Sequence, residues 1–283
     1  MARLRDEGKL KQIALGLRRD IIEMITRAGS GHPGGSLSSV EVVSALYYGE
    51  MNYDPKNYKD PNRDRFVLSK GHCCPVLYAT LASIGAIPRA SLWTLRKLHS
   101  PLQGHPCRLK MPQIEISTGS LGQGISVGVG MAMAARLDKK SYRTYVLLGD
   151  GECQEGETWE AAMTAGVKKL DNLCAIVDYN HVQQTHPVKE IKDIEPIADK
   201  WRAFNWHALT IEGNEYPAIF KALDEARATK GKPTVIIAST QKGKGVSFME
   251  GDPAFHGKSP NPEEYVKAMA ELGVDVSGGK TYS

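Results

Sequence analysis

The stretch VLLGDGECQEGETWEAAMTAG, residues 146–166, decides the fold class of this sequence. An apolar run stops at Gly149-Asp150-Gly151, and a segment rich in glutamate and alanine follows it. An apolar strand that turns at glycine into a helix is the repeating unit of a parallel sheet covered by helices. The glycines also let a ligand approach the backbone closely. The stretch therefore predicts a functional site beside Asp150, where a strand ends.

The same unit recurs along the chain. Runs rich in aliphatic and β-branched residues predict strands over 65–69, 142–149, 172–179, 206–213 and 233–240. Helical patterns occupy 9–29, 38–51, 124–139 and 215–229. This alternation predicts a three-layer αβα fold with a mainly parallel sheet, in which ligands bind beyond the carboxyl ends of the strands. No repeat or linker marks a boundary, so we predict a single domain over 1–283. Its core would span about 10–250, and 251–283 would form a loop, a short helix and a tail.

The composition excludes several classes of protein. Charged residues make up 24% and hydrophobic residues 41% of the 283 residues, which is ordinary for a globular chain. The net charge of +4 is spread along the sequence, whereas a nucleic-acid-binding protein usually gathers its basic residues on one face. No apolar run is long enough to span a membrane, and the five cysteines show no C-x-x-C spacing. We expect a cytoplasmic protein that binds neither nucleic acid nor membrane.

Asp150 and Asn180 form a candidate metal site. Asn180 ends the strand after that of Asp150, so the two side chains should lie at neighbouring strand ends. Carboxylate, amide and carbonyl oxygens are ligands that Mg²⁺ accepts, and a backbone carbonyl such as that of Val182 could complete the set. The alternative is that Asp150 caps a helix and Asn180 forms a turn.

Four of the eight histidines lie in strand-end loops flanked by glycine or proline. They are His32, His72, His105 and His256. Imidazole exchanges protons near neutral pH, so a histidine cluster suits acid–base chemistry, although a single histidine is more often structural. The segment QKGKG (241–245) fits a phosphate contact or a solvated loop equally well. Catalysis by Cys73 or Cys74 is disfavoured because no orienting group is visible for a thiolate.

Five segments in consistent order resemble the N-terminal region of transketolase, a thiamine diphosphate enzyme. They are SGHPGGSLS, LSKGHCCPVLYATL, TGSLGQGISVGVGMAMAARL, GDGECQEGETWEAAMTAG and LDNLCAIVDYN. The resemblance implies the thiamine diphosphate-binding fold, in which this chain is the diphosphate-binding domain. It also implies transfer of a two-carbon ketol unit from a ketose phosphate to an aldose phosphate.

The resemblance assigns roles to individual residues. It implies that Asp150, Asn180 and the Val182 carbonyl hold Mg²⁺ or another divalent cation. The residues implied to contact thiamine diphosphate are His72, Gly119, Ser120, Leu121, Gly151, Asn180 and His256. The four loop histidines would surround the reacting carbon. Glu155 and Glu160 would face a subunit interface that links two cofactor sites.

The resemblance also implies a partner. In transketolases the glutamate that activates the cofactor lies in a second, pyrimidine-binding domain, which this sequence lacks. We expect the N-terminal subunit of a split enzyme, completed by a C-terminal transketolase subunit in an α₂β₂ assembly; a fragment of a longer chain is the alternative. The sequence departs from the family at HVQQTHP (181–187), where Gln184 replaces an aliphatic residue near the cofactor. The rival functions are the α subunit of a 2-oxo-acid dehydrogenase and a non-catalytic regulatory subunit.

Overall fold

The computed structural model describes residues 3–279 and 282, and these residues are organised around a five-stranded sheet. The strands run parallel in the order β1-β2-β3-β7-β6. Their bounds are β1 Arg65–Leu68, β2 Thr144–Gly149, β3 Leu173–Tyr179, β6 His207–Glu212 and β7 Thr234–Ser239. Every one of these strands falls inside a range predicted from the sequence, so the predicted parallel sheet is confirmed.

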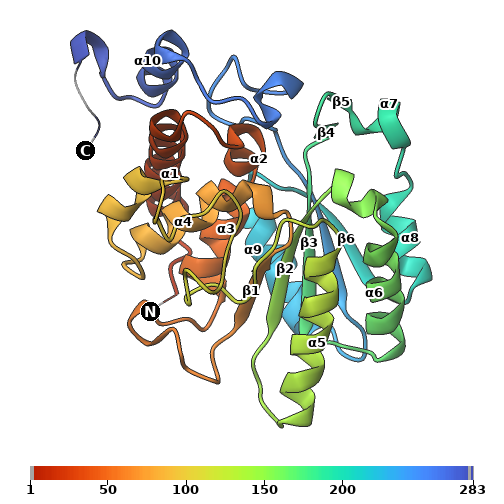
Figure 1. Cartoon of the computed structure of the whole chain (residues 1–283). Helices are drawn as coiled ribbons and strands as arrows, with labels where there is room; N and C mark the ends of the chain where they lie inside the picture. The colour runs from red at the N-terminus through yellow and green to blue at the C-terminus, as the bar shows by residue number, and fades with distance from the viewer. Residues whose placement is uncertain (1–2, 280–281, 283) are drawn as a thin grey trace.

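The strands send alternate side chains into two separate apolar clusters. Tyr145 and Leu147 of β2 pack in one cluster, and Val146 and Leu148 pack in the other. The first cluster also contains residues of α1 (Glu7–Ala28), α3 (Val40–Ser44), α4 (Cys74–Ser83) and α9 (Tyr216–Ala228). The second contains residues of α5 (Gln123–Leu137), α6 (Gly156–Val167) and α8 (Ile197–Ala203). Figure 1 shows α5 and α6 on the side of the sheet opposite α1 and α4. The three-layer αβα fold is therefore confirmed.

The helix predicted over 38–51 is divided into shorter segments. Its first residue ends α2 (Pro33–Ser38), α3 follows at Val40, and a π-helix covers Ala45–Glu50. The break falls at Ser38 and Ser39, whose hydroxyls donate to the Gly35 carbonyl and to the Asp178 carboxylate. Serine hydroxyls that bond elsewhere compete with a continuous helix. These hydrogen bonds connect the break between α2 and α3 to Asp178 near the end of β3.

The turn after Asp150 also differs from the prediction. A 3-10 helix, Gly151–Gln154, follows Asp150, and α6 begins only at Gly156. The helix predicted after the glycines is therefore preceded by a 3-10 turn, which the Asp150 side chain caps. The cause is Glu152, whose buried carboxylate accepts from the backbone N–H groups of Gly149 and Gly122 and so holds the turn in place.

The remaining elements lie in the connections between these helices and strands and after β7. They are the antiparallel hairpin β4 (Val182–Gln183) and β5 (His186–Pro187), α7 (Val188–Lys192), α10 (Pro262–Glu271) and 3-10 turns at Pro55–Asn57, Gly71–Cys73, Arg89–Thr94, Pro253–His256 and Ser277–Gly279. A reciprocal cap between Asn261 and Glu264 starts α10, which buries Ala268 and Met269 in the cluster of α1. Within residues 3–279 and 282, no helix is long and apolar enough to cross a membrane.

Candidate active site

The four predicted histidines meet above the carboxyl ends of the strands. The ring centroid of His32 lies 5.1 Å from that of His72, 6.2 Å from that of His105 and 5.4 Å from that of His256. The rings of His72 and His256 are 5.1 Å apart. All four line one cavity of about 430 Å³. The predicted convergence of these side chains is therefore observed.

The chain brings each histidine to this point from a different element. His32 directly precedes α2, and His72 lies in the turn after β1. His105 lies in the long connection before α5, and its ring would meet a Cβ at Gly119 at 2.7 Å. Gly119 also has a φ of 141°, which disfavours any side chain there. A glycine at 119 therefore leaves room for the His105 ring.

The histidine cluster is electrically neutral near pH 7. Burial, followed by nearby positive charge, lowers the pKa of His32 to about 4 and that of His256 to about 3. The same causes lower the pKa of His72 well below its usual value, and that of His105 in the same direction. Neutral imidazole carries one donor and one acceptor nitrogen, so each ring can take a proton at one atom and give one at the other.

Asp150 is a buried carboxylate on the cavity wall. Its Oδ1 accepts from the Gly151 N–H at 2.7 Å and its Oδ2 accepts from the His181 N–H at 2.6 Å. Burial raises its pKa to about 6, and the Asp178 carboxylate acts in the same direction. A cation beside Asp150 would relieve this cost, because opposite charge favours the ionised carboxylate. The environment therefore suits a metal ligand.

Asn180 and Val182 lie beside Asp150 and line the same cavity. The Asn180 amide donates to Asp178 at 2.9 Å, and its Oδ1 accepts from the Val182 N–H at 3.2 Å. In the described part of the chain, no three His, Cys, Asp or Glu side chains are grouped to hold an ion. A site with a single carboxylate, an amide oxygen and a carbonyl suits Mg²⁺ that also takes phosphate oxygens.

The loop residues predicted to contact the cofactor divide into two groups. Gly119, Leu121 and Gly151 line the cavity, whereas Ser120 is exposed and lies outside its wall. A Cβ at Gly151 would come within 3.1 Å of Gln183, so this close approach also favours glycine. The role of Ser120 stays a prediction.

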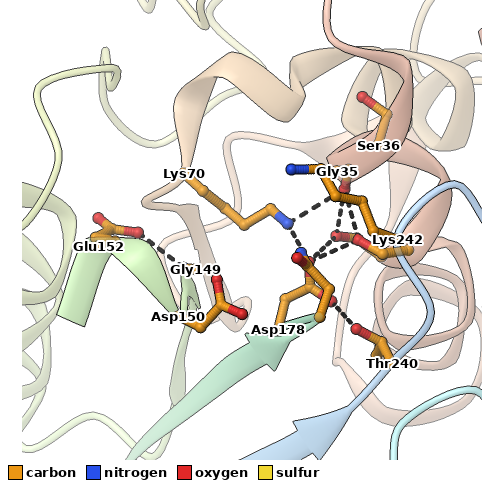
Figure 2. A network of polar contacts seen from close by, with 12 residues as sticks. Gly35, Ser36, Lys70, Gly149, Asp150, Glu152, Asp178, Thr240 and Lys242 are labelled. Carbon is orange, nitrogen blue, oxygen red and sulfur yellow. Dashed lines mark hydrogen bonds and ion pairs between the residues drawn. The ribbon is translucent and has the colours of Figure 1, made fainter. Parts of the chain in front are cut away.

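Four charged side chains in or directly behind the cavity wall are buried, which the sequence did not predict. Lys70, Glu152, Asp178 and Lys242 are each at most 2% exposed. Figure 2 shows Lys70 from the end of β1 pointing at Asp178 from β3, with which it forms an ion pair. Burial opposes both charges, yet the pair lowers the pKa of Asp178 and raises that of Lys70. The available signal was the position of each residue at or just beyond a strand end.

Of the two interpretations left open for the QKGKG segment, the position of Lys242 is at odds with a solvated loop. Its Nζ donates to the Val182 carbonyl at 2.8 Å and contacts His256 Nδ1 at 3.2 Å. An ammonium group can only donate, so Nδ1 of the neutral His256 is the acceptor and its proton lies on Nε2. Burial lowers the pKa of Lys242 to about 8. The segment therefore places a cation in the cavity.

The HVQQTHP segment folds as the β4–β5 hairpin over the cavity. Gln183 exchanges two hydrogen bonds with Gln154, at 2.6 and 3.3 Å, which fastens the hairpin to the turn after Asp150. Gln184 lines the cavity, and it adopts a φ of 25° in the turn of the hairpin. The Val182 carbonyl thus remains at the site, although the HVQQTHP segment departs from the family pattern.

Other predicted residues lie at the edge of the site or outside it. Glu155 and Glu160 are both exposed, as an interface role requires of an isolated chain. Cys73 and Cys74 are buried, and burial raises their pKa to about 11 and about 12, so neither is a ready thiolate.

Comparison with known proteins identifies the family. The family described as transketolase, thiamine diphosphate binding domain, matches residues 10–278. The chain belongs to the transketolase family. This result confirms the resemblance found in the sequence and favours it over the α subunit of a 2-oxo-acid dehydrogenase.

Relatives of this transketolase domain include both separate subunits and longer chains. It is 46% identical to an apulose-4-phosphate transketolase subunit of Phocaeicola vulgatus, over 90% of each chain. It is also 46% identical to a 6-deoxy-6-sulfo-D-fructose transketolase subunit of a Clostridium species, over 90% of this chain and 93% of that protein. The transketolase of Rattus norvegicus is 44% identical over 93% of this chain but only 41% of its own length.

Solved transketolases share the fold. A Campylobacter jejuni transketolase superposes with a TM-score of 0.90 at 35% identity, covering 96% of this chain and 44% of that one. A Pichia stipitis transketolase variant gives 0.91 at 31% identity, covering 97% and 42%. The transketolase domain therefore spans less than half of these solved enzymes and nearly all of the separate subunits.

The cavity fits thiamine diphosphate on its own chemistry. Lys242 and the Gly151 backbone lie on the wall beside Asp150, where a diphosphate with its cation would balance the charges. Among the described residues, His32 Nδ1 is buried without a hydrogen-bond partner, so the cavity retains an unused polar atom for a ligand.

Proposed function

We propose that this chain is the N-terminal subunit of a split transketolase. With a C-terminal partner subunit it would move a two-carbon ketol unit from a ketose phosphate to an aldose phosphate, using thiamine diphosphate and Mg²⁺ or another divalent cation. The observation that carries the proposal is the single cavity in which four neutral histidines face Asp150, Asn180 and Val182. Family membership supports the cofactor.

The metal-binding residues would fix the cofactor's anionic end. Asp150 supplies the charge, while the Asn180 amide oxygen and the Val182 carbonyl supply neutral oxygens. Lys242 would bind diphosphate oxygens on the same wall, where Gly151 lets the ligand approach the backbone closely. When bound, thiamine diphosphate supplies the nucleophilic carbon that carries the ketol unit.

The histidines would handle substrate protons. A ketol transfer requires removal of a proton from one hydroxyl and its return to another oxygen. His256, whose Nδ1 accepts from Lys242, presents its Nε2–H to a ligand as a donor. His32, His72 and His105 are neutral as well, so they offer acceptor nitrogens for the proton that is removed.

A partner subunit would complete the site. The domain spans nine-tenths of relatives named as subunits but about two-fifths of the longer transketolases, which supports a separate C-terminal chain. We assign Glu155 and Glu160, both exposed near the start of α6, to the contact between subunits in an α₂β₂ assembly. The five free cysteines support a cytoplasmic location.

The test is reconstitution with a candidate partner that carries a pyrimidine-binding domain. We expect ketol transfer from a panel of ketose phosphates only when both chains, thiamine diphosphate and Mg²⁺ are present. The panel should include a 6-sulfo ketose, because one relative at 46% identity is named for such a sugar.

Three outcomes would contradict the proposal or one of its parts. If the reconstituted pair decarboxylates pyruvate and does not transfer ketol units, this chain would be the α subunit of a 2-oxo-acid dehydrogenase. Failure of the pair to bind thiamine diphosphate in calorimetry would indicate a non-catalytic subunit. Turnover by this chain alone would refute the need for a partner.

A further inference from the structure

Asp178 lies directly behind the Asn180 amide and does not reach the cavity. The Asp178 side chain is fully buried and is absent from the cavity wall, which Asn180 lines. Its Oδ2 accepts from the Asn180 Nδ2 at 2.9 Å and from the Ser38 hydroxyl at 2.6 Å. Asp178 therefore contacts the cavity wall through Asn180 and Lys70, and of these two residues Asn180 is the one assigned to the cation.

The charges around Asp178 make it an acceptor and not a donor. Lys70 donates to Oδ2, and Thr240 donates to Oδ1 from the end of β7 (Figure 2). With Lys70 beside it, Asp178 is ionised, and an ionised carboxylate has no hydrogen to give. The side chain at position 180 must therefore present a donor toward Asp178.

This requirement settles which way the Asn180 amide points. An amide has a donor end and an acceptor end, and only the donor end matches the carboxylate. With Nδ2 held by Asp178, Oδ1 faces the opposite side, where it accepts from the Val182 N–H. A carbonyl-type oxygen has a second lone pair, so Oδ1 still has capacity for a cation.

We propose that Asp178 is a positioning residue that fixes the Asn180 amide with its oxygen toward the cation site, so that position 180 requires asparagine. Residues behind metal ligands commonly set ligand orientation in this way. The inference rests on the proposed function in that it assumes a cation at Asn180. It has a counterintuitive consequence, because aspartate, ordinarily the better cation ligand, would fail at position 180.

The experiment removes the donor that faces Asp178. Asn180→Asp places two carboxylates in contact, and we expect it to weaken Mg²⁺-dependent binding of thiamine diphosphate by about 10- to 100-fold. Asn180→Ala removes the amide oxygen without adding a charge, and we expect Asn180→Asp to bind no more tightly than Asn180→Ala. Calorimetry on the full chain with its partner measures both, without reference to turnover.

A matched control separates orientation from general packing. Thr240→Val removes a hydrogen bond from the other oxygen of the same carboxylate and leaves the Asn180 contact in place. We expect a lower unfolding temperature, because a hydrogen bond to an ionised carboxylate is lost, but less than about threefold loss of cofactor affinity, because the Asn180 contact remains. A loss in Thr240→Val equal to that in Asn180→Asp would overturn the inference, as would tighter binding by Asn180→Asp than by Asn180→Ala.

A second measurement needs no variant and no metal. Hydrogen exchange of the Asn180 side-chain amide, followed by NMR in the unchanged chain, should be slow because the amide is buried and bonded to Asp178. Fast exchange at this amide would refute the held orientation even if the cofactor binds. Slow exchange without any cofactor binding would instead support the orientation and count against the proposed function.

Discussion

The Nζ atom of Lys242 lies 2.8 Å from the carbonyl oxygen of Val182, the backbone group assigned to the divalent cation. The Lys242 ammonium group thus already donates to an oxygen that the metal would use. An ammonium group and a metal ion on the same carbonyl oxygen repel each other, so binding of the metal should move Lys242 toward the diphosphate. Lys242 is therefore expected to weaken the binding of the metal alone and to strengthen the binding of the metal together with the cofactor.

Lys242→Met should weaken binding of thiamine diphosphate with Mg²⁺ by at least about tenfold, because a charged hydrogen bond to the diphosphate is lost. Binding of Mn²⁺ alone, followed by electron paramagnetic resonance, should be equal or tighter because the competing ammonium is gone. Lys244→Met in the same segment is the control, since Lys244 is only half-buried and does not line the cavity. Weaker Mn²⁺ binding in Lys242→Met would contradict the expected competition between Lys242 and the metal.

Asp150→Ala should abolish Mg²⁺-dependent binding of thiamine diphosphate, with a loss of at least about 100-fold. Asp150 is the carboxylate of the predicted ligand set, and its carboxyl group is buried on the cavity wall. Calorimetry with and without a chelator measures the metal-dependent part. Asp138→Asn, at the exposed end of α5, should leave the affinity unchanged. Retention of full affinity in Asp150→Ala would remove Asp150 from the site.

Acid should destabilise the metal-free chain through the buried histidines. The folded-state pKa of His32, about 4, and that of His256, about 3, lie below the ordinary value near 6.5. The unfolded chain therefore takes up these protons first, and the free energy of unfolding falls as pH drops below about 6.5. Asp150, whose pKa is raised, acts in the opposite direction between about pH 4 and pH 6.

His256→Asn should reduce this acid sensitivity. We expect the difference in unfolding free energy between pH 7 and pH 5 to shrink by about 2 kcal/mol, which urea titration at the two pH values can measure. His99→Asn is the matched control, because His99 is exposed. An equal change in both variants would show that the effect is not specific to the cavity.

Gln183→Ala should loosen the hairpin that carries the Val182 carbonyl. The substitution removes both hydrogen bonds to Gln154, each of which contributes about 0.5–1.5 kcal/mol. We expect cofactor affinity to fall by roughly 3- to 30-fold. Thr185→Ala, an exposed position in the same hairpin, should bind the cofactor normally. Identical affinities in the two variants would mean that the amide pair does not position Val182.

The sequence was sufficient to predict the sheet and the histidine cluster for a simple physical reason. Parallel strands end on one edge, so polar or glycine-rich residues just after several strands must come together there. His72 and Asp150 follow that rule directly. The buried charges were not predictable, because Lys70 and Lys242 look like solvated lysines until their partners on other strands are known. The break at Ser39 was missed for the same reason, since its hydroxyl contacts are made with Gly35 and Asp178.

The spacing of the four imidazoles limits how many protons they can hold together. Positive charge on one ring lowers the affinity of its neighbours for a second proton at 5–6 Å, as the effects of His256 on His72 and of His32 on His256 indicate. The cluster, which is neutral near pH 7, therefore resists holding more than one transferred proton at a time. A proton taken from one substrate hydroxyl must leave the cavity or return to substrate before the next is accepted, which would impose an order on the two halves of a group transfer.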